Sequence, residues 1–191
     1  MNIIDKFSLI LLVILFLIQI FKRDLLKKIT FIWIFAVSGI FLAGAVESIN
    51  QYLLWQKDPI FKFLIPPHQN INYFLKFVGL RFFSYWILAL IAALSLNKIA
   101  FWANKKYNER FFESEEISLG TLGMFLTGWP GFLFYIALIL FLGLILSLIY
   151  TLKNKGRAPL YYFWLSGAIA IILVKNFILP IFPILIFLFL F

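Results

Sequence analysis

The chain has no cysteine and a single histidine among its 191 residues. The lack of cysteine excludes disulfides, thiolate metal sites and a cysteine nucleophile. His68 follows Pro66 and Pro67 in a segment with the composition of a solvated loop, whereas a serine–histidine pair or a zinc site would need this histidine. The sequence therefore predicts no metal site and no bound cofactor.

Charge is also scarce in this chain. Charged residues make up 13% of it, against 64% hydrophobic residues, and only 8 residues are acidic. So few polar side chains cannot cover a water-facing surface, and we predict that lipid surrounds most of the chain. The net charge of +9 would suit nucleic acid, but the basic residues cluster beside apolar runs, where they contact lipid headgroups and set the direction of insertion. We expect the lipid bilayer, and not nucleic acid, as the partner.

Long apolar runs are what the sequence has in abundance. A helix crosses a bilayer with about 20 apolar residues, and several runs approach or exceed this length. We predict an all-α, polytopic integral membrane protein with one membrane-embedded helical bundle of about six transmembrane helices. A short, broken apolar segment at 178–191 follows, because Pro180 and Pro183 disfavour a clean further helix. The expected helices are 3–21, 29–46, 82–102, 115–127, 132–152 and 160–174.

Basic clusters set the predicted topology. Lys22 and Arg23 begin a cluster after the first run, and such clusters stay on the cytoplasmic side, which places the N-terminus outside a bacterial or archaeal cytoplasmic membrane. The first run has no basic region before it and no small-residue cleavage site after it, so we expect a retained helix and not a secretory signal. The cytoplasmic connections are then about 22–28, 103–116 and 153–159, and the external loop is about 48–70.

The short helix before Gly128 leaves two alternatives. Residues 115–151 form either one kinked helix or two helices joined by a turn at 128–131. Only the second alternative places the basic connections before and after this pair on the same side of the membrane. We therefore predict a helical hairpin.

Polar residues at the edge of a bilayer are costly, so they mark candidate sites. In the predicted topology Gln19, Asp24, Glu115 and Glu116 all reach the cytoplasmic interface. Two carboxyl groups there can share a proton and activate water, as they do in aspartic proteases. Alternatively, Asp24 balances its basic neighbours, and the two glutamates stabilise the start of a helix through its dipole.

Residues 85–129 resemble the core of the type IV prepilin and preflagellin peptidases. In that family an apolar helix leads into a basic loop, a GxGD motif and a small-residue helix that ends in Gly-Trp. Glu116 stands where the motif aspartate would be, and Gly128 and Trp129 match the end of the helix. Residues 155–167 also resemble the family's basic, proline-containing loop and the helix after it.

The resemblance implies a six-helix bundle that cleaves basic leader peptides from pilin-like substrates with two aspartates at the cytoplasmic interface. In this chain Gln19 best occupies the position of the first aspartate, and Glu116 occupies that of the second. An amide cannot share the catalytic proton as a carboxylate does, unless Asp24 supplies the missing carboxyl group. The catalytic candidates are therefore Glu116, Asp24 and Gln19.

The predicted function is that of a prepilin-peptidase-like membrane protein, which processes or binds the basic leader peptides of pilin-like substrates. Because the expected aspartates are replaced, the sequence leaves open whether the protein is an active enzyme. The alternative is a noncatalytic helical subunit of a larger membrane complex. The 20% aromatic content suits this alternative, since it provides broad apolar flanks for lipid or for neighbouring subunits.

Overall fold

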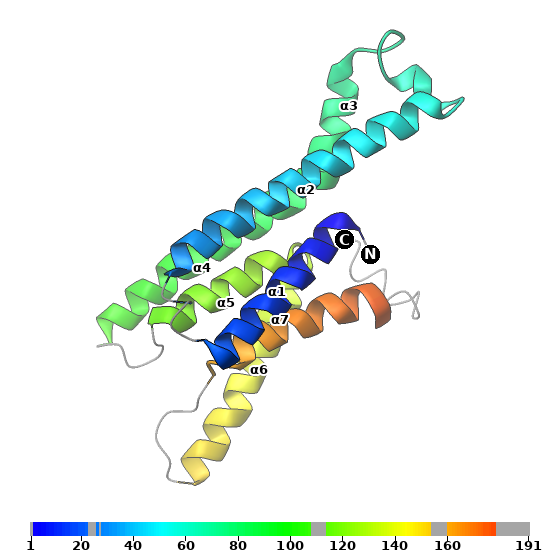
Figure 1. Cartoon of the computed structure of the whole chain (residues 1–191). Helices are drawn as coiled ribbons and strands as arrows, with labels where there is room; N and C mark the ends of the chain where they lie inside the picture. The colour runs from blue at the N-terminus through cyan, green and yellow to red at the C-terminus, as the bar shows by residue number, and fades with distance from the viewer. Residues whose placement is uncertain (1, 23–25, 27, 108–113, 154–159, 179–191) are drawn as a thin grey trace.

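The computed structural model describes residues 2–22, 26, 28–107, 114–153 and 160–178, and all regular elements within these ranges are helical (Figure 1). Four helical runs are long and apolar enough to cross a membrane, as expected for a polytopic membrane protein. These runs are 3–21, 29–57, 71–106 and 131–152.

Helix α1 (Ile3–Phe21) has the bounds predicted for the first apolar run. The side chain of Asn2 caps its start by accepting a hydrogen bond of 2.7 Å from the backbone N–H of Asp5. This cap satisfies one of the backbone N–H groups that a helix start leaves without a partner. The helix therefore begins with a local signal that lies just before the apolar run.

Helix α2 (Ile29–Lys57) continues well past the predicted end at residue 46, so the prediction of a loop over 48–70 is wrong for its first ten residues. The carboxylate of Glu47, which suggested an exit into water, instead accepts a hydrogen bond of 2.9 Å from the backbone N–H of Ile3. Because this charge has a partner inside the protein, the helix does not need to end near it. After α2 the chain forms a short 3₁₀ helix, η2 (Phe61–Leu64).

A second long helical run returns antiparallel to α2. It consists of α3 (Ile71–Val78), a π-helical segment η3 (Gly79–Phe83) and α4 (Ser84–Lys106), so the predicted helix at 82–102 is only its middle part. The hairpin of α2 and this run extends beyond the start of α1 (Figure 1). At about 1.5 Å per residue, its two arms are longer than a hydrocarbon core of about 30 Å.

The tip of this hairpin has a small core of its own. Trp55, Ile65, Phe74 and Val78 are buried together there. Trp55 stacks on Phe61, with ring centroids 5.6 Å apart, and makes edge contact with Phe74. This aromatic cluster holds the end of α2, the 3₁₀ helix and α3 as one unit.

Helices α5 (Ser114–Thr127) and α6 (Gly131–Leu152) form the predicted hairpin, and the alternative of one kinked helix is wrong. Gly128 forms the turn with a φ of 65°, which is a left-handed conformation that favours glycine. An ideal Cβ at this residue would lie 2.9 Å from Cη2 of Trp86. The turn therefore needs glycine both for its backbone and for the close approach of α4.

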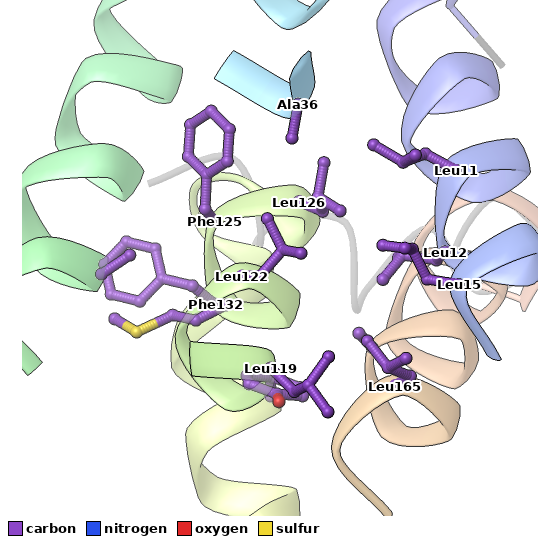
Figure 2. Packing of buried hydrophobic residues seen from close by; sticks show 14 of the residues in the cluster. Leu11, Leu12, Leu15, Ala36, Leu119, Leu122, Phe125, Leu126, Phe132 and Leu165 are labelled. Carbon is purple, nitrogen blue, oxygen red and sulfur yellow. The ribbon is translucent and has the colours of Figure 1, made fainter. Parts of the chain in front are cut away.

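Helix α5 is the centre of the bundle. All residues from Glu116 to Gly128 are buried, and α5 packs against α1, α2, α4, α6 and α7. Leucines form its contact with α1 and α7, and Figure 2 shows them pointing toward one another. The labelled leucines of this contact are Leu11, Leu12, Leu15, Leu119, Leu122, Leu126 and Leu165.

The last described elements are α7 (Phe163–Leu173) and a π-helical continuation, η4 (Val174–Ile178). They replace the helix predicted at 160–174 with one that starts three residues later and runs four residues further. The apolar segment predicted to be broken at 178–191 lies, after its first residue, outside the described residues. Of the predicted cytoplasmic connections, 103–106 belong to α4, and most of the remaining residues also lie outside the described ranges.

Candidate functional site

Three hydrogen bonds bring the ends of five helices to one end of the bundle, which we call the Gln19 end. Gln19, near the end of α1, donates from Nε2 to the carbonyl oxygen of Tyr161, just before α7, at 2.6 Å. Trp33, near the start of α2, donates from Nε1 to the carbonyl oxygen of Ser118 at 3.4 Å. In α4, Asn97 donates from Nδ2 to Oγ1 of Thr121 in α5 at 2.9 Å. The ends of α1 and α4 therefore meet the starts of α2, α5 and α7.

Gln19 is a fixed, buried amide. Its residue is only 2% exposed, and its bond to the carbonyl oxygen of Tyr161 defines which amide atom is the nitrogen. The amide oxygen, Oε1, is buried and has no hydrogen-bond partner in the described part of the chain. A buried acceptor of this kind is costly, so it marks a position where a ligand or a proton-bearing group would be stabilised.

Glu116 lies in the first turn of α5 and is 4% exposed. The partial positive charge at a helix start stabilises a carboxylate there. Because α5 packs directly on α1, Gln19 and Glu116 belong to two contacting helices and lie at the same end of the bundle. The neighbouring Glu115 is half-buried.

Asp24, the third predicted catalytic residue, lies outside the described residues. Among the described carboxylates, only Asp5 and Glu116 are buried, and Asp5 lies at the opposite end of α1. Within the described residues, no three histidine, cysteine or acidic side chains gather as metal ligands would. The described part of the Gln19 end thus offers one buried carboxyl group and one buried amide.

A polar network beside Glu116 was not predicted from the sequence. Thr121 accepts a hydrogen bond from Asn97 and lies 2.9 Å from the carbonyl oxygen of Ile117 one turn earlier. The Tyr135 hydroxyl of α6 lies 3.1 Å from two carbonyl oxygens, those of Gly120 and Trp164. The available signal was the presence of these polar side chains within apolar helices, where each needs a partner.

A buried ion pair at the opposite end was also missed. Lys175 Nζ lies 3.1 Å from Asp5 Oδ1, and the two side chains are 24% and 5% exposed. Together with the bond of Gln19 to Tyr161, this pair fixes α7 antiparallel to α1. The sequence signal was an aspartate at the start of an otherwise apolar helix.

A partly open apolar pocket lies next to the first two turns of α5. Its volume is about 140 Å³, and it is lined by residues of α4, α5, α6 and α7. The lining residues are Leu96, Ala100, Ile117, Gly120, Thr121, Tyr135, Ile136, Ile139, Leu140 and Trp164. The Gln19 end thus combines a buried carboxyl group, a buried amide and a neighbouring apolar pocket. No protein-family model, curated protein or solved structure matches this chain.

Proposed function

We propose that this protein is prepilin-peptidase-like and that its Gln19 end binds or processes the basic leader peptides of pilin-like substrates. In this proposal the chain crosses a bacterial or archaeal cytoplasmic membrane six times, with the N-terminus outside and the Gln19 end at the cytoplasmic face. The exposed Lys22, Lys28, Lys105 and Lys106 support this orientation, because all four lie at the Gln19 end.

Two of the six crossings would be short. Helix α5 has 14 residues, or about 21 Å of rise, and α7 with its π-helical continuation has 16. A hydrocarbon core is about 30 Å thick. Because the neighbouring helices enclose α5, lipid meets those neighbours and not α5 itself, so its length does not have to match the bilayer.

The burial of Glu116 is the observation that carries the proposal. Burying a carboxylate within a membrane bundle is unfavourable, and such residues face functional sites as a rule. Here the carboxylate belongs to the one helix that five others enclose, and it lies at the same end as Gln19. A negative site at a cytoplasmic rim attracts a basic peptide segment even where no bond is cleaved.

Cleavage would need a second carboxyl group besides Glu116. Two carboxyl groups that share a proton can activate water, whereas the amide of Gln19 neither releases nor accepts that proton. Asp24 is the available second carboxylate in the sequence. We therefore expect cleavage, where present, to depend on both Glu116 and Asp24, and we expect Gln19→Asp to increase it.

A cleavage assay in membranes with a prepilin-type substrate tests this proposal. Loss of cleavage in Glu116→Gln and in Asp24→Asn supports a peptidase. Glu47→Gln is the matched control, because it removes a carboxylate in the other half of the bundle and keeps an oxygen that can accept the Ile3 N–H. A protein that neither cleaves nor binds the leader peptide, even as Gln19→Asp, would contradict the proposal.

A noncatalytic subunit of a larger membrane complex is the second candidate function. It is favoured by the second half of α6, where no side chain from Leu140 to Leu152 is buried by the described part of the chain. Such a face suits lipid or a neighbouring subunit. Purification in a mild detergent distinguishes the candidates, because a complex would give a partner in constant stoichiometry, whereas the chain alone has a mass of 22.4 kDa.

A further inference from the structure

The apolar pocket beside α5 has the size of one large side chain. Its volume of about 140 Å³ is close to that of apolar protein cavities that hold a benzene ring, which are about 150 Å³. Carbon atoms of leucine, isoleucine and aromatic side chains make up most of its wall, and Gly120 contributes no side chain to its floor. The pocket therefore suits a phenylalanine, leucine or isoleucine side chain better than a polar ligand.

The pocket opens toward lipid. Leu140 on its rim is 68% exposed, and α6 leads away from the rest of the bundle (Figure 1). On the other side, Leu96 and Ala100 of α4 are only half-buried. Both α4 and α6 pack on α5, so α5 forms the floor between them. A ligand that reaches this floor between apolar walls comes from within the bilayer and not from water.

The charge next to the pocket identifies the ligand. Glu115 and Glu116 immediately precede Ile117, which lines the pocket. A ligand that places an apolar group in the pocket would therefore have its next segment beside two carboxylates. A phospholipid would bring its phosphate there, with the wrong sign of charge, whereas a membrane helix with a basic flank is complementary.

We propose that this pocket is the docking site for the membrane helix of the substrate. One bulky apolar side chain of that helix occupies the pocket between α4 and α6, and the basic residues that flank the helix lie at Glu115 and Glu116. This inference rests on the proposed function and adds a lateral route, by which the substrate helix enters from the bilayer. The binding energy then comes from two parts of the substrate, a basic leader and an apolar anchor.

The test uses the purified full-length protein in phosphatidylcholine vesicles and two synthetic peptides. One peptide is a Lys/Arg-rich leader followed by an apolar helix with one phenylalanine near the junction, and the other is the leader alone. Ala100→Phe fills the pocket from α4 and should weaken binding of the long peptide by about 10-fold or more, since it removes the burial of one aromatic ring. Binding of the leader alone should not change.

Ile99→Phe is the matched control, because Ile99 is on the same helix but 61% exposed. It should leave the binding of both peptides unchanged. Leu140→Trp, at the opposite rim, gives a second block if Ala100→Phe does not fold. A photo-crosslinker in place of Ile136 should react with the long peptide, and a crosslinker in place of the exposed Leu133 should not.

The outcomes separate the docking site from the function. If the unmodified protein binds neither peptide, the proposed function fails and the docking site fails with it. If the leader binds but the rim variants and Ile99→Phe bind the long peptide equally well, the docking site alone is wrong. Crosslinking of Ile136 to phospholipid in the presence of saturating peptide would likewise overturn the docking site.

Discussion

Helices α5 and α6 are consecutive apolar helices joined by a tight turn, yet their surroundings are opposite. All residues of α5 from Glu116 onward are buried, whereas no side chain of α6 after Ile139 is. The difference lies in side-chain size and not in hydrophobicity alone. Close approach of five helices requires small residues, and α5 contains Ser118, Gly120 and Gly123, whereas α6 is dominated by leucine, isoleucine and phenylalanine.

The comparison shows how a membrane protein positions a site. An enclosed helix is surrounded by protein, so polar groups on it can be given partners, as Thr121 is by Asn97. An exposed helix meets lipid, which provides no hydrogen bonds. The buried carboxyl group of Glu116 therefore belongs on α5, and the apolar wall of the proposed docking site belongs on α6.

The same substitution in the two helices should have opposite effects. In α5, an ideal Cβ on Gly120 would lie 2.5 Å from the Trp164 ring, so Gly120→Ala should destabilise the protein by about 2 kcal/mol. In α6, a Cβ on Gly143 would lie 3.6 Å from Leu160, so Gly143→Ala should be neutral or stabilising by up to about 1 kcal/mol. Thermal unfolding in detergent measures both. Equal losses would show that α5 is not enclosed.

Removing one hydroxyl group should show the same contrast at a smaller scale. Tyr135→Phe removes the contacts to the carbonyl oxygens of Gly120 and Trp164 and should lower stability by about 1 kcal/mol. Tyr150→Phe, in the half-buried second part of α6, is the control and should change the melting temperature little. A similar effect of both substitutions would mean that the Tyr135 hydroxyl does not link α5, α6 and α7.

The hydrogen bond between α4 and α5 can be isolated by a double-mutant cycle. Asn97→Ala and Thr121→Val each remove one partner. Hydrogen bonds between membrane helices are modest, so we expect a coupling free energy of about 0.6 kcal/mol. Unfolding of the two single variants and the double variant gives this value. Strict additivity would indicate that the two side chains do not interact.

The smallest effect is expected at the exposed tip of the α2 hairpin. The backbone N–H groups of Phe61 and Ile60 hold the pKa of Asp58 below its ordinary value, at distances of 3.0 and 2.8 Å. A lowered pKa means that the ionised carboxylate stabilises the tip above about pH 4 and that this contribution disappears as the pH falls through the lowered pKa. NMR titration of the Asp58 carboxyl carbon checks the direction. Asp58→Ala should also speed trypsin cleavage after Lys62, and an unchanged rate would refute the cap.

The sequence predicted the elements whose signals are local. The bounds of α1, the start of α2 and the turn at Gly128 follow from apolar runs and from glycine, and the structure confirms them. The end of α2 was predicted wrongly, because a partner for Glu47 comes from the start of α1, which no local pattern reveals.

The candidate site was predicted only in part. The sequence singled out Gln19 and Glu116 from their places at helix ends, and the structure brings them to one end of the bundle. It did not single out Tyr135 or the apolar pocket, since both depend on which helices enclose α5. Hydropathy is similar for enclosed and exposed helices, so this information is absent from single-sequence patterns. Whether these residues form a peptidase site stays a prediction.

The ion pair of Asp5 with Lys175 has a consequence for biogenesis. The two partners are 170 positions apart, and Gln19 and Tyr161 are 142 apart. A ribosome therefore delivers α1 to the membrane long before either partner exists. Until α7 is inserted, the aspartate must stay hydrated at the bilayer surface or be held by the insertion machinery. Assembly of this bundle is thus completed from its last helices, and nascent chains that stop before residue 160 should be targets for membrane quality control.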